Sequence, residues 1–180
     1  MMQVFDEQGI AFAFPDDFVV FRPQHSVFYR KLWQRFSIPD AAGEKGNKEA
    51  DFVAVDRKEQ RLWLIEAKDY RVHERTKPGS LSQEFARKCR DSLALLAALQ
   101  LSSTAAEVGE TASGLLDGLK KVSCVLHVEQ KAGEKLFPLA VRPTDLKDAL
   151  RRELHALDPQ ALTGTAAELA TLQLPFTITV

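Results

Sequence analysis

The stretch that most constrains this chain runs from residue 50 to residue 68 and reads ADFVAVDRKEQRLWLIEAK. Two apolar runs, residues 52–55 and 62–65, flank six polar residues, which is the pattern of two antiparallel strands joined by a tight turn. Neither run alternates with polar residues, so we expect strands that are buried on both faces. The stretch therefore predicts a buried hairpin with charged residues at its open end.

The register of this hairpin follows from its loop length. A four-residue loop after Asp56 places this residue opposite Arg61 and, counting back along the ladder, Asp51 opposite Glu66. Opposed residues share a face with their Cβ atoms about 5 Å apart, so two carboxylates there are unfavourable unless a cation lies between them. Lys68 follows Glu66 by two residues and projects from the same face. The hairpin predicts a compact group of two acids and one amine.

This group resembles the motif of the PD-(D/E)xK phosphodiesterase superfamily, the restriction-endonuclease-like nucleases. That motif is an Asp before one strand and an acid-x-Lys triplet at the end of the next. Here fourteen residues separate Asp51 from Glu66-Ala67-Lys68, and Ala50 stands where the motif often has Pro, a departure that the superfamily tolerates. The resemblance implies one α/β domain over residues 1–180, with a restriction-endonuclease-like mixed central sheet flanked by helices.

The resemblance also implies metal-dependent hydrolysis of phosphodiester bonds in DNA or RNA. Asp51 and Glu66, with the backbone carbonyl of Ala67, would hold one or two Mg²⁺ ions, or Mn²⁺ as a substitute, because hard cations prefer oxygen ligands. Lys68 would position the attacking water or stabilise the transition state. Cleavage that leaves a 5′-phosphate and a 3′-hydroxyl is an expectation from the resemblance alone.

One departure concerns the third acid that many members carry on their first helix. The predicted first helix, residues 24–36, contains no Asp or Glu. Glu49 is one substitute ligand, because the hairpin count places it opposite Lys68; an ion pair with Lys68 is the equally weighted alternative, and Glu44 is a weaker candidate. The missing acid also supports a second hypothesis, a catalytically inactive domain of this fold that binds nucleic acid or another protein.

The residues after Lys68 form a basic region beside the two acids. From residue 68 to residue 90 there are seven Lys or Arg and three acids, a local net charge of +4. Such a region attracts the phosphates that carboxylates alone would repel. Alternatively, Glu84 with Lys88 and Arg87 with Asp91 are i,i+4 pairs on a solvated helix face. The nucleic-acid-binding candidates are Arg71, Arg75, Lys77, Gln83, Arg87 and Lys88.

Composition bounds the remaining function classes. The chain has 180 residues, of which 45% are hydrophobic, enough for one domain with a full core. The net charge of −1 gives no overall attraction to nucleic acid, so any basic footprint is local. Cys89 and Cys124 are expected to be reduced core thiols. With neither a signal peptide nor a membrane span in the sequence, we expect a cytoplasmic protein with nucleic acid, DNA first, as partner; a homodimer is compatible with this.

The other predicted elements form a scaffold around the hairpin. Short β-like runs near the N-terminus suggest a small meander at the sheet edge. Ser80 begins a long helix, Thr144 caps another, and Thr165 with Glu168 opens a short last one. The predicted strands outside the central hairpin are residues 4–5, 10–14, 18–21, 122–128, 136–141 and 177–180.

Overall fold

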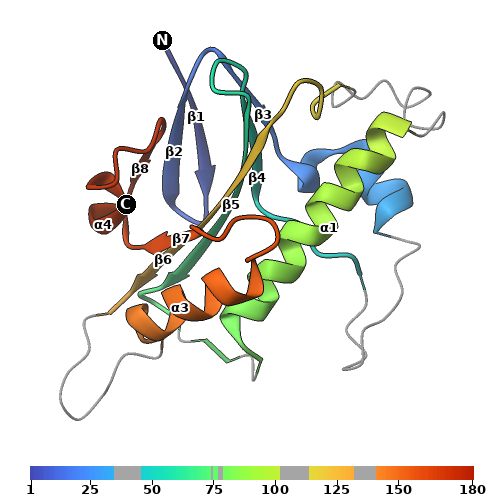
Figure 1. The fold of residues 1–180 in the computed structure, drawn as a ribbon. Coiled ribbons are helices and arrows are strands. Elements are labelled where there is room, and N and C mark those ends of the chain that lie inside the picture. The colour runs from blue at the N-terminus through green and yellow to red at the C-terminus, as the bar shows by residue number, and fades with distance from the viewer. Residues whose placement is uncertain (35–45, 74, 77–78, 102–113, 132–140) are drawn as a thin grey trace.

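The computed structural model describes residues 1–34, 46–73, 75–76, 79–101, 114–131 and 141–180. The chain is mixed α/β, with two sheets and a few helices (Figure 1). The larger sheet has the strand order β3-β4-β5-β6-β7 and the smaller one β1-β2-β8. The strands are β1 (Met2–Glu7), β2 (Ile10–Pro15), β3 (Phe18–Phe21), β4 (Phe52–Asp56), β5 (Arg61–Tyr70), β6 (Lys121–Gln130), β7 (Leu162–Gly164) and β8 (Thr177–Thr179).

The five-stranded sheet combines both strand directions. β3, β4 and β5 are antiparallel to one another in turn, whereas β5–β6 and β6–β7 are parallel. Parallel neighbours require a crossover connection, and the long helix α1 (Leu81–Leu101) lies in the one between β5 and β6. Among the described residues, the other helical segments are η1 (Pro23–His25), η2 (Tyr29–Trp33), α3 (Pro143–Glu153) and α4 (Ala166–Ala170).

The predicted central hairpin and its register are confirmed. Asp56 pairs with Arg61, and Phe52 pairs with Ile65, as the four-residue loop requires. Gln60, the last loop residue, has a positive φ of 51°. All five residues of β4 are buried, which explains why the run carries no polar alternation.

Two hydrophobic cores lie on opposite faces of the hairpin. On one face Val53 and Leu64 pack in a core with residues of α1 and α3. On the other face Phe52 and Ile65 pack against the three-stranded sheet and α4. The result is a layered arrangement in which the five-stranded sheet lies between helices and a second sheet (Figure 1). Because side chains alternate along a strand, Glu66 and Lys68 fall on the face that α1 covers.

The N-terminal meander prediction is wrong in its placement. β1 and β2 form a hairpin whose turn residues Gln8 and Gly9 both have positive φ, as a tight two-residue turn demands. β2 then pairs with β8 in the separate sheet, and only β3 joins the five-stranded sheet, beside β4. The phenylalanines of β2 explain the division, because they cover the second face of the central hairpin.

The structure tests three predictions about helices. In the described part of the predicted helix 24–36, which ends at residue 34, the chain forms a short 3-10 turn and a five-residue π-helix, whose capping bond joins Gln34 N to Tyr29 O. Thr144 does not cap α3, because the helix begins one residue earlier with Pro143 at its first position. The capping box of Thr165 and Glu168 is confirmed at α4.

The remaining predictions concern a strand, a loop, the two cysteines and membrane-spanning helices. Residues 136–140 of the predicted return strand 136–141 and most of the loop after the first helix lie outside the described residues. Cys89 and Cys124 are free and buried, as expected. Within the described parts of the chain, no helix combines the length and the apolar character needed to cross a bilayer.

Candidate active site

Asp51 lies directly before β4, and its side chain contacts the neighbouring strand β5. Its Oδ2 accepts a hydrogen bond of 2.8 Å from the backbone N–H of Ala67. This contact continues the β4–β5 pairing beyond Phe52 and Ile65 and agrees with the predicted position of Asp51 across from Glu66. The Asp51 carboxylate is therefore oriented by the backbone of the strand that carries Glu66 and Lys68.

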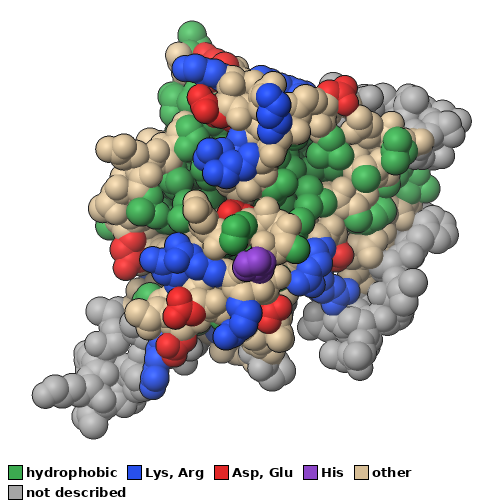
Figure 2. Space-filling model, in the orientation of Figure 1, with side chains coloured by type: hydrophobic (Ala, Val, Ile, Leu, Met, Phe, Trp, Pro, Cys, Tyr) green, Lys and Arg blue, Asp and Glu red, His purple; other side chains and the backbone are tan. Residues whose placement is uncertain are grey.

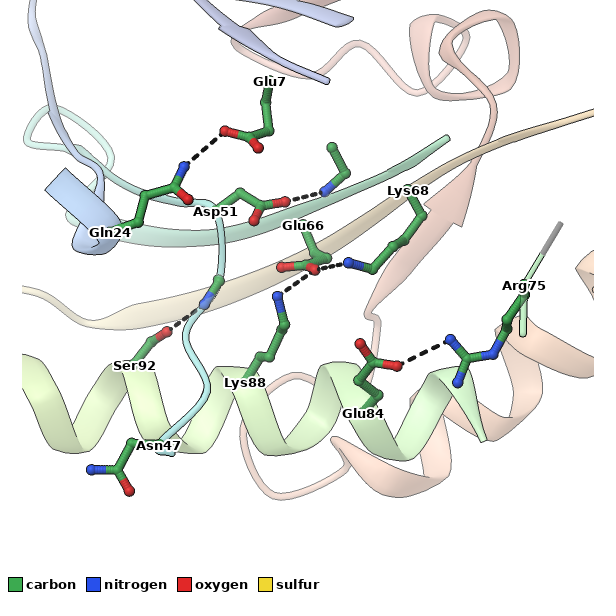
Figure 3. A network of polar contacts seen from close by, with 12 residues as sticks. Glu7, Gln24, Asn47, Asp51, Glu66, Lys68, Arg75, Glu84, Lys88 and Ser92 are labelled. Atoms are coloured by element: carbon green, nitrogen blue, oxygen red, sulfur yellow. Dashed lines mark hydrogen bonds and ion pairs between the residues drawn. The ribbon is translucent and has the colours of Figure 1, made fainter. Parts of the chain in front are cut away.

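Glu66 lies at the centre of the site and is fully buried. Its Oε1 contacts the Nζ of Lys68 and the Nζ of Lys88, each at 2.5 Å (Figure 3). Its Oε2 is buried without a hydrogen-bond partner. A buried carboxylate oxygen without a partner is unfavourable, so Glu66 has one saturated oxygen and one that can accept a ligand.

Charge and burial perturb the ionisation of this group. Burial, together with the negative charge of Glu66, raises the pKa of Asp51 to about 7. Burial by itself would lower the pKa of Lys68, but the charge and hydrogen bond of Glu66 outweigh it and raise that pKa above its ordinary value. The carboxylates of Asp51 and Glu66 thus repel each other, and Lys68 stays protonated.

The raised pKa of Asp51 predicts the direction in which stability changes with pH. Between 3.8, its ordinary pKa, and about 7, the folded protein keeps a proton that the unfolded chain releases. The free energy of unfolding should therefore fall by about 2 kcal/mol from pH 5 to pH 8 through this group. Urea unfolding of wild type and Asp51→Asn at both pH values measures it: the asparagine variant should lack this component, and an identical pH dependence in both proteins would contradict the assignment.

Helix α1 holds the segment that leads into Asp51. Ser92 Oγ accepts a hydrogen bond of 2.9 Å from the backbone N–H of Ala50, and Asp91 Oδ2 accepts one of 2.8 Å from that of Lys48. Both side chains project from the helix that also carries Lys88, and Figure 3 shows Ser92 and Lys88 on it. The helix therefore positions both the backbone before Asp51 and the amine that contacts Glu66.

Glu49, the substitute for the missing third acid, lies in the same region. Burial raises its pKa, while a hydrogen bond from Tyr29 and the charge of Lys88 act in the opposite direction. Its Oε2 is buried without a hydrogen-bond partner, like that of Glu66. The choice between metal ligand and ion-pair partner of Lys68 therefore stays open for this residue, whereas Glu44 lies outside the described residues.

Asp51 and Glu66 fit a divalent cation as a pair. Among the described residues, no three His, Cys, Asp or Glu side chains are grouped closely enough to enclose a metal ion. Mg²⁺ commonly uses only one or two protein carboxylates and completes its shell with water and substrate phosphate. The unpartnered Oε2 of Glu66 and the mutual repulsion of the two acids suit this mode of binding.

The predicted nucleic-acid-binding residues lie in varied settings. Arg71 pairs with Asp69 at 2.6 Å, and Arg75 pairs with Glu84 at 3.0 Å. The predicted pair between Arg87 and Asp91 is present, with Nε and Oδ2 3.7 Å apart. Gln83 is exposed on α1, and Lys77 lies outside the described residues. On the face drawn in Figure 2, basic and acidic side chains are interspersed, so a nucleic-acid interface stays a prediction.

A polar cluster at the start of β4 was not foreseen. Glu7 Oε2 accepts a hydrogen bond from Arg22 Nη2 at 2.5 Å and one from Gln24 Nε2 at 2.8 Å, which Figure 3 shows. The Arg22 guanidinium also lies over the ring of Phe52, the residue after Asp51, 5.1 Å from its centroid. No spacing pattern signals this cluster, because it joins the end of β1 to the segment around η1.

Comparison with known proteins identifies no relative. No protein-family model, no curated protein and no solved structure matches the chain.

Proposed function

We propose that this protein is a metal-dependent phosphodiesterase that cleaves nucleic acid, with a restriction-endonuclease-like fold. The observation that carries the proposal is the pair of converging carboxylates at the open end of the hairpin. Glu66 is fully buried with an unpartnered Oε2, and its charge helps to raise the pKa of Asp51. A merely structural ion pair does not require a second buried acid, whereas a divalent cation gives both carboxylates a partner.

The strand arrangement adds support to the proposed fold. The antiparallel pair β4–β5 leads through α1 to β6, which lies parallel to β5. This is a mixed central sheet with a helix packed on the face that carries the acids. The acid-x-Lys triplet ends near the edge of the buried part of β5, where burial changes from complete at Ala67 to partial at Lys68.

The proposed chemistry assigns a distinct role to each side chain. Asp51 and Glu66 would hold Mg²⁺, which would supply a water of lowered pKa and neutralise charge on the scissile phosphate. Lys68 is kept protonated by Glu66 and lies two residues beyond it, so its ammonium can stabilise negative charge that develops on the phosphate oxygens. Ala67 orients Asp51 through its backbone N–H.

Calorimetric titration with Mg²⁺ and Mn²⁺, alone and with nucleic acid, tests the proposal together with a screen for cleavage of single- and double-stranded DNA and RNA. We expect one divalent-ion site in the wild type that Asp51→Asn and Glu66→Gln each weaken by about tenfold or more, because each variant removes a charged oxygen ligand. Cleavage should require the metal. If the wild type cleaves none of these substrates in a metal-dependent way, the proposal is refuted.

Two observations favour a second function, a catalytically inactive nucleic-acid-binding module. Lys68 and Lys88 already neutralise Glu66 without a metal, and the described residues bring no third acid into a metal-binding group. The same titrations separate the two functions. An inactive module should bind nucleic acid without any dependence on Mg²⁺, and Glu66→Gln should leave that binding unchanged. The phosphodiesterase should need the metal for cleavage, and Glu66→Gln should abolish this cleavage.

A further inference from the structure

Two lysine ammonium groups contact a single oxygen of Glu66. Their combined charge of +2 exceeds the single negative charge of this carboxylate. Both Nζ atoms lie 2.5 Å from Oε1, and the side chains of Lys68 and Lys88 are only 17% and 14% exposed. Two ammonium groups that share one oxygen repel each other in a setting of low solvent screening. Glu66 meanwhile keeps Oε2 unpartnered, so the arrangement is not the one that best pairs these charges.

The two lysines differ in how firmly they are held. Lys68 belongs to the same strand as Glu66, and the charges of Asp51 and Glu84 also favour its protonated form. Lys88 reaches Glu66 from α1, across the space between helix and sheet, as Figure 3 shows. A lysine ammonium on a flexible four-carbon stem can change partner without movement of the backbone. Lys88 is therefore the amine that can leave.

We propose that Lys88 is a displaceable counter-ion: its ammonium neutralises Glu66 in the metal-free protein and moves to a phosphate of the substrate when the metal binds. This inference rests on the proposed function and states how metal and substrate depend on each other. A divalent cation at Glu66 and Asp51 repels the neighbouring Lys88 ammonium. That ammonium is largely buried, so leaving it without an anion is costly. A phosphodiester oxygen supplies the new partner.

Metal and nucleic acid should consequently bind with positive coupling. Without substrate, the metal must displace Lys88 and leave it unpaired, which weakens metal binding. With a phosphate present, Lys88 has a partner, and this opposition is removed. By thermodynamic reciprocity, the metal strengthens nucleic-acid binding by the same factor. The structure thus points to a site that acquires its metal together with its substrate.

Titration of Mn²⁺ into the substrate-free protein tests the first part. Lys88→Met keeps the unbranched apolar stem of the side chain but removes the ammonium, and it should tighten Mn²⁺ binding by about tenfold or more. Arg90→Met is the matched control, because it removes one positive charge from an exposed position of the same helix. The Arg90 guanidinium donates a hydrogen bond to the backbone carbonyl of Glu153. Its Mn²⁺ affinity should stay within about twofold of wild type. Equal affinities in Lys88→Met and wild type would overturn the inference.

A second titration measures the coupling itself, with a cleavage-resistant phosphorothioate oligodeoxynucleotide as the probe. The oligonucleotide should raise the Mn²⁺ affinity of wild type by about tenfold and that of Lys88→Met by less than about threefold. Equal coupling in both would also overturn the inference. Urea unfolding shows whether Lys88→Met is folded, and Lys88→Gln replaces it if it is not.

The two proposals fail in different ways. Wild-type protein that cleaves with Mg²⁺, combined with unchanged Mn²⁺ affinity in Lys88→Met, would keep the proposed function and remove the role of Lys88. Wild-type protein without metal-dependent cleavage, combined with tighter Mn²⁺ binding in Lys88→Met, would refute the function but support displacement.

Discussion

Asp51→Asn should lower the rate of Mg²⁺-dependent cleavage by about 10³-fold, measured under single-turnover conditions with saturating metal. The substitution keeps the size of the side chain and an oxygen that accepts the hydrogen bond from Ala67 N–H, so the hairpin should retain its geometry. It removes the negative charge that holds the cation opposite Glu66. The loss therefore isolates the charge of Asp51 from its structural contact.

Asp56→Asn is the matched control for this variant. Asp56 ends the same strand, β4, and its Oδ1 accepts a hydrogen bond of 3.0 Å from the backbone N–H of Glu59, which asparagine can also accept. Its substitution should leave cleavage within about twofold of wild type, because such an isosteric change is far from the site. Cleavage at the wild-type rate by Asp51→Asn would remove this residue from the metal site.

Glu66→Gln should reduce the free energy of unfolding by about 3 kcal/mol, measured by urea unfolding at pH 7.5. The variant leaves the ammonium groups of Lys68 and Lys88 beside a neutral amide, although both side chains are largely buried. Removing one partner of a buried ion pair strands the other charge, and here two charges are stranded. The stability of this variant therefore measures how far the lysines depend on Glu66.

A double-mutant cycle identifies the source of that loss. Adding Lys88→Met to Glu66→Gln should restore part of the lost stability, because one of the stranded ammonium groups is then absent. Glu59→Gln, an exposed acid in the turn of the same hairpin, should change stability by less than about 0.5 kcal/mol. A Glu66→Gln variant as stable as wild type would contradict the ion pairs at Oε1.

The two acids should therefore affect stability with opposite signs. Burial and the charge of Glu66 disfavour the ionised form of Asp51, so neutralising Asp51 should stabilise the protein above neutral pH. Neutralising Glu66 should destabilise the protein. Structural carboxylates are normally arranged so that their charge stabilises the fold. An acid whose charge is unfavourable in the metal-free protein is typical of a functional site.

The register of the central hairpin could be predicted because it depends on local information. The loop length and the two apolar runs determine that Phe52 pairs with Ile65, and the two-residue period of a strand places Glu66 and Lys68 on one face. Asp51 then follows at a known distance along the chain. The core of the candidate site thus comes from a segment of about twenty residues, within which geometry follows from sequence spacing.

Helix boundaries and sheet membership were less predictable because they depend on competition between distant segments. The apolar period of residues 24–36 indicated one α-helix, but the chain forms a 3-10 turn and a π-helix there. The short N-terminal strands carried no signal of which sheet they join. That choice is made by burial, since Phe12 and Phe14 of β2 cover the face of the hairpin that the helices leave open.

The sequence by itself determined that Asp51, Glu66 and Lys68 form one group, because strand periodicity and loop length act over short distances along the chain. Only the tertiary structure decided what surrounds this group. Lys88, a predicted nucleic-acid-binding residue, contacts Oε1 of Glu66, and Ser92 holds the backbone before Asp51. Both contacts depend on the rotation of α1 about its axis against the sheet, which is set by packing across the whole core and not by any local pattern.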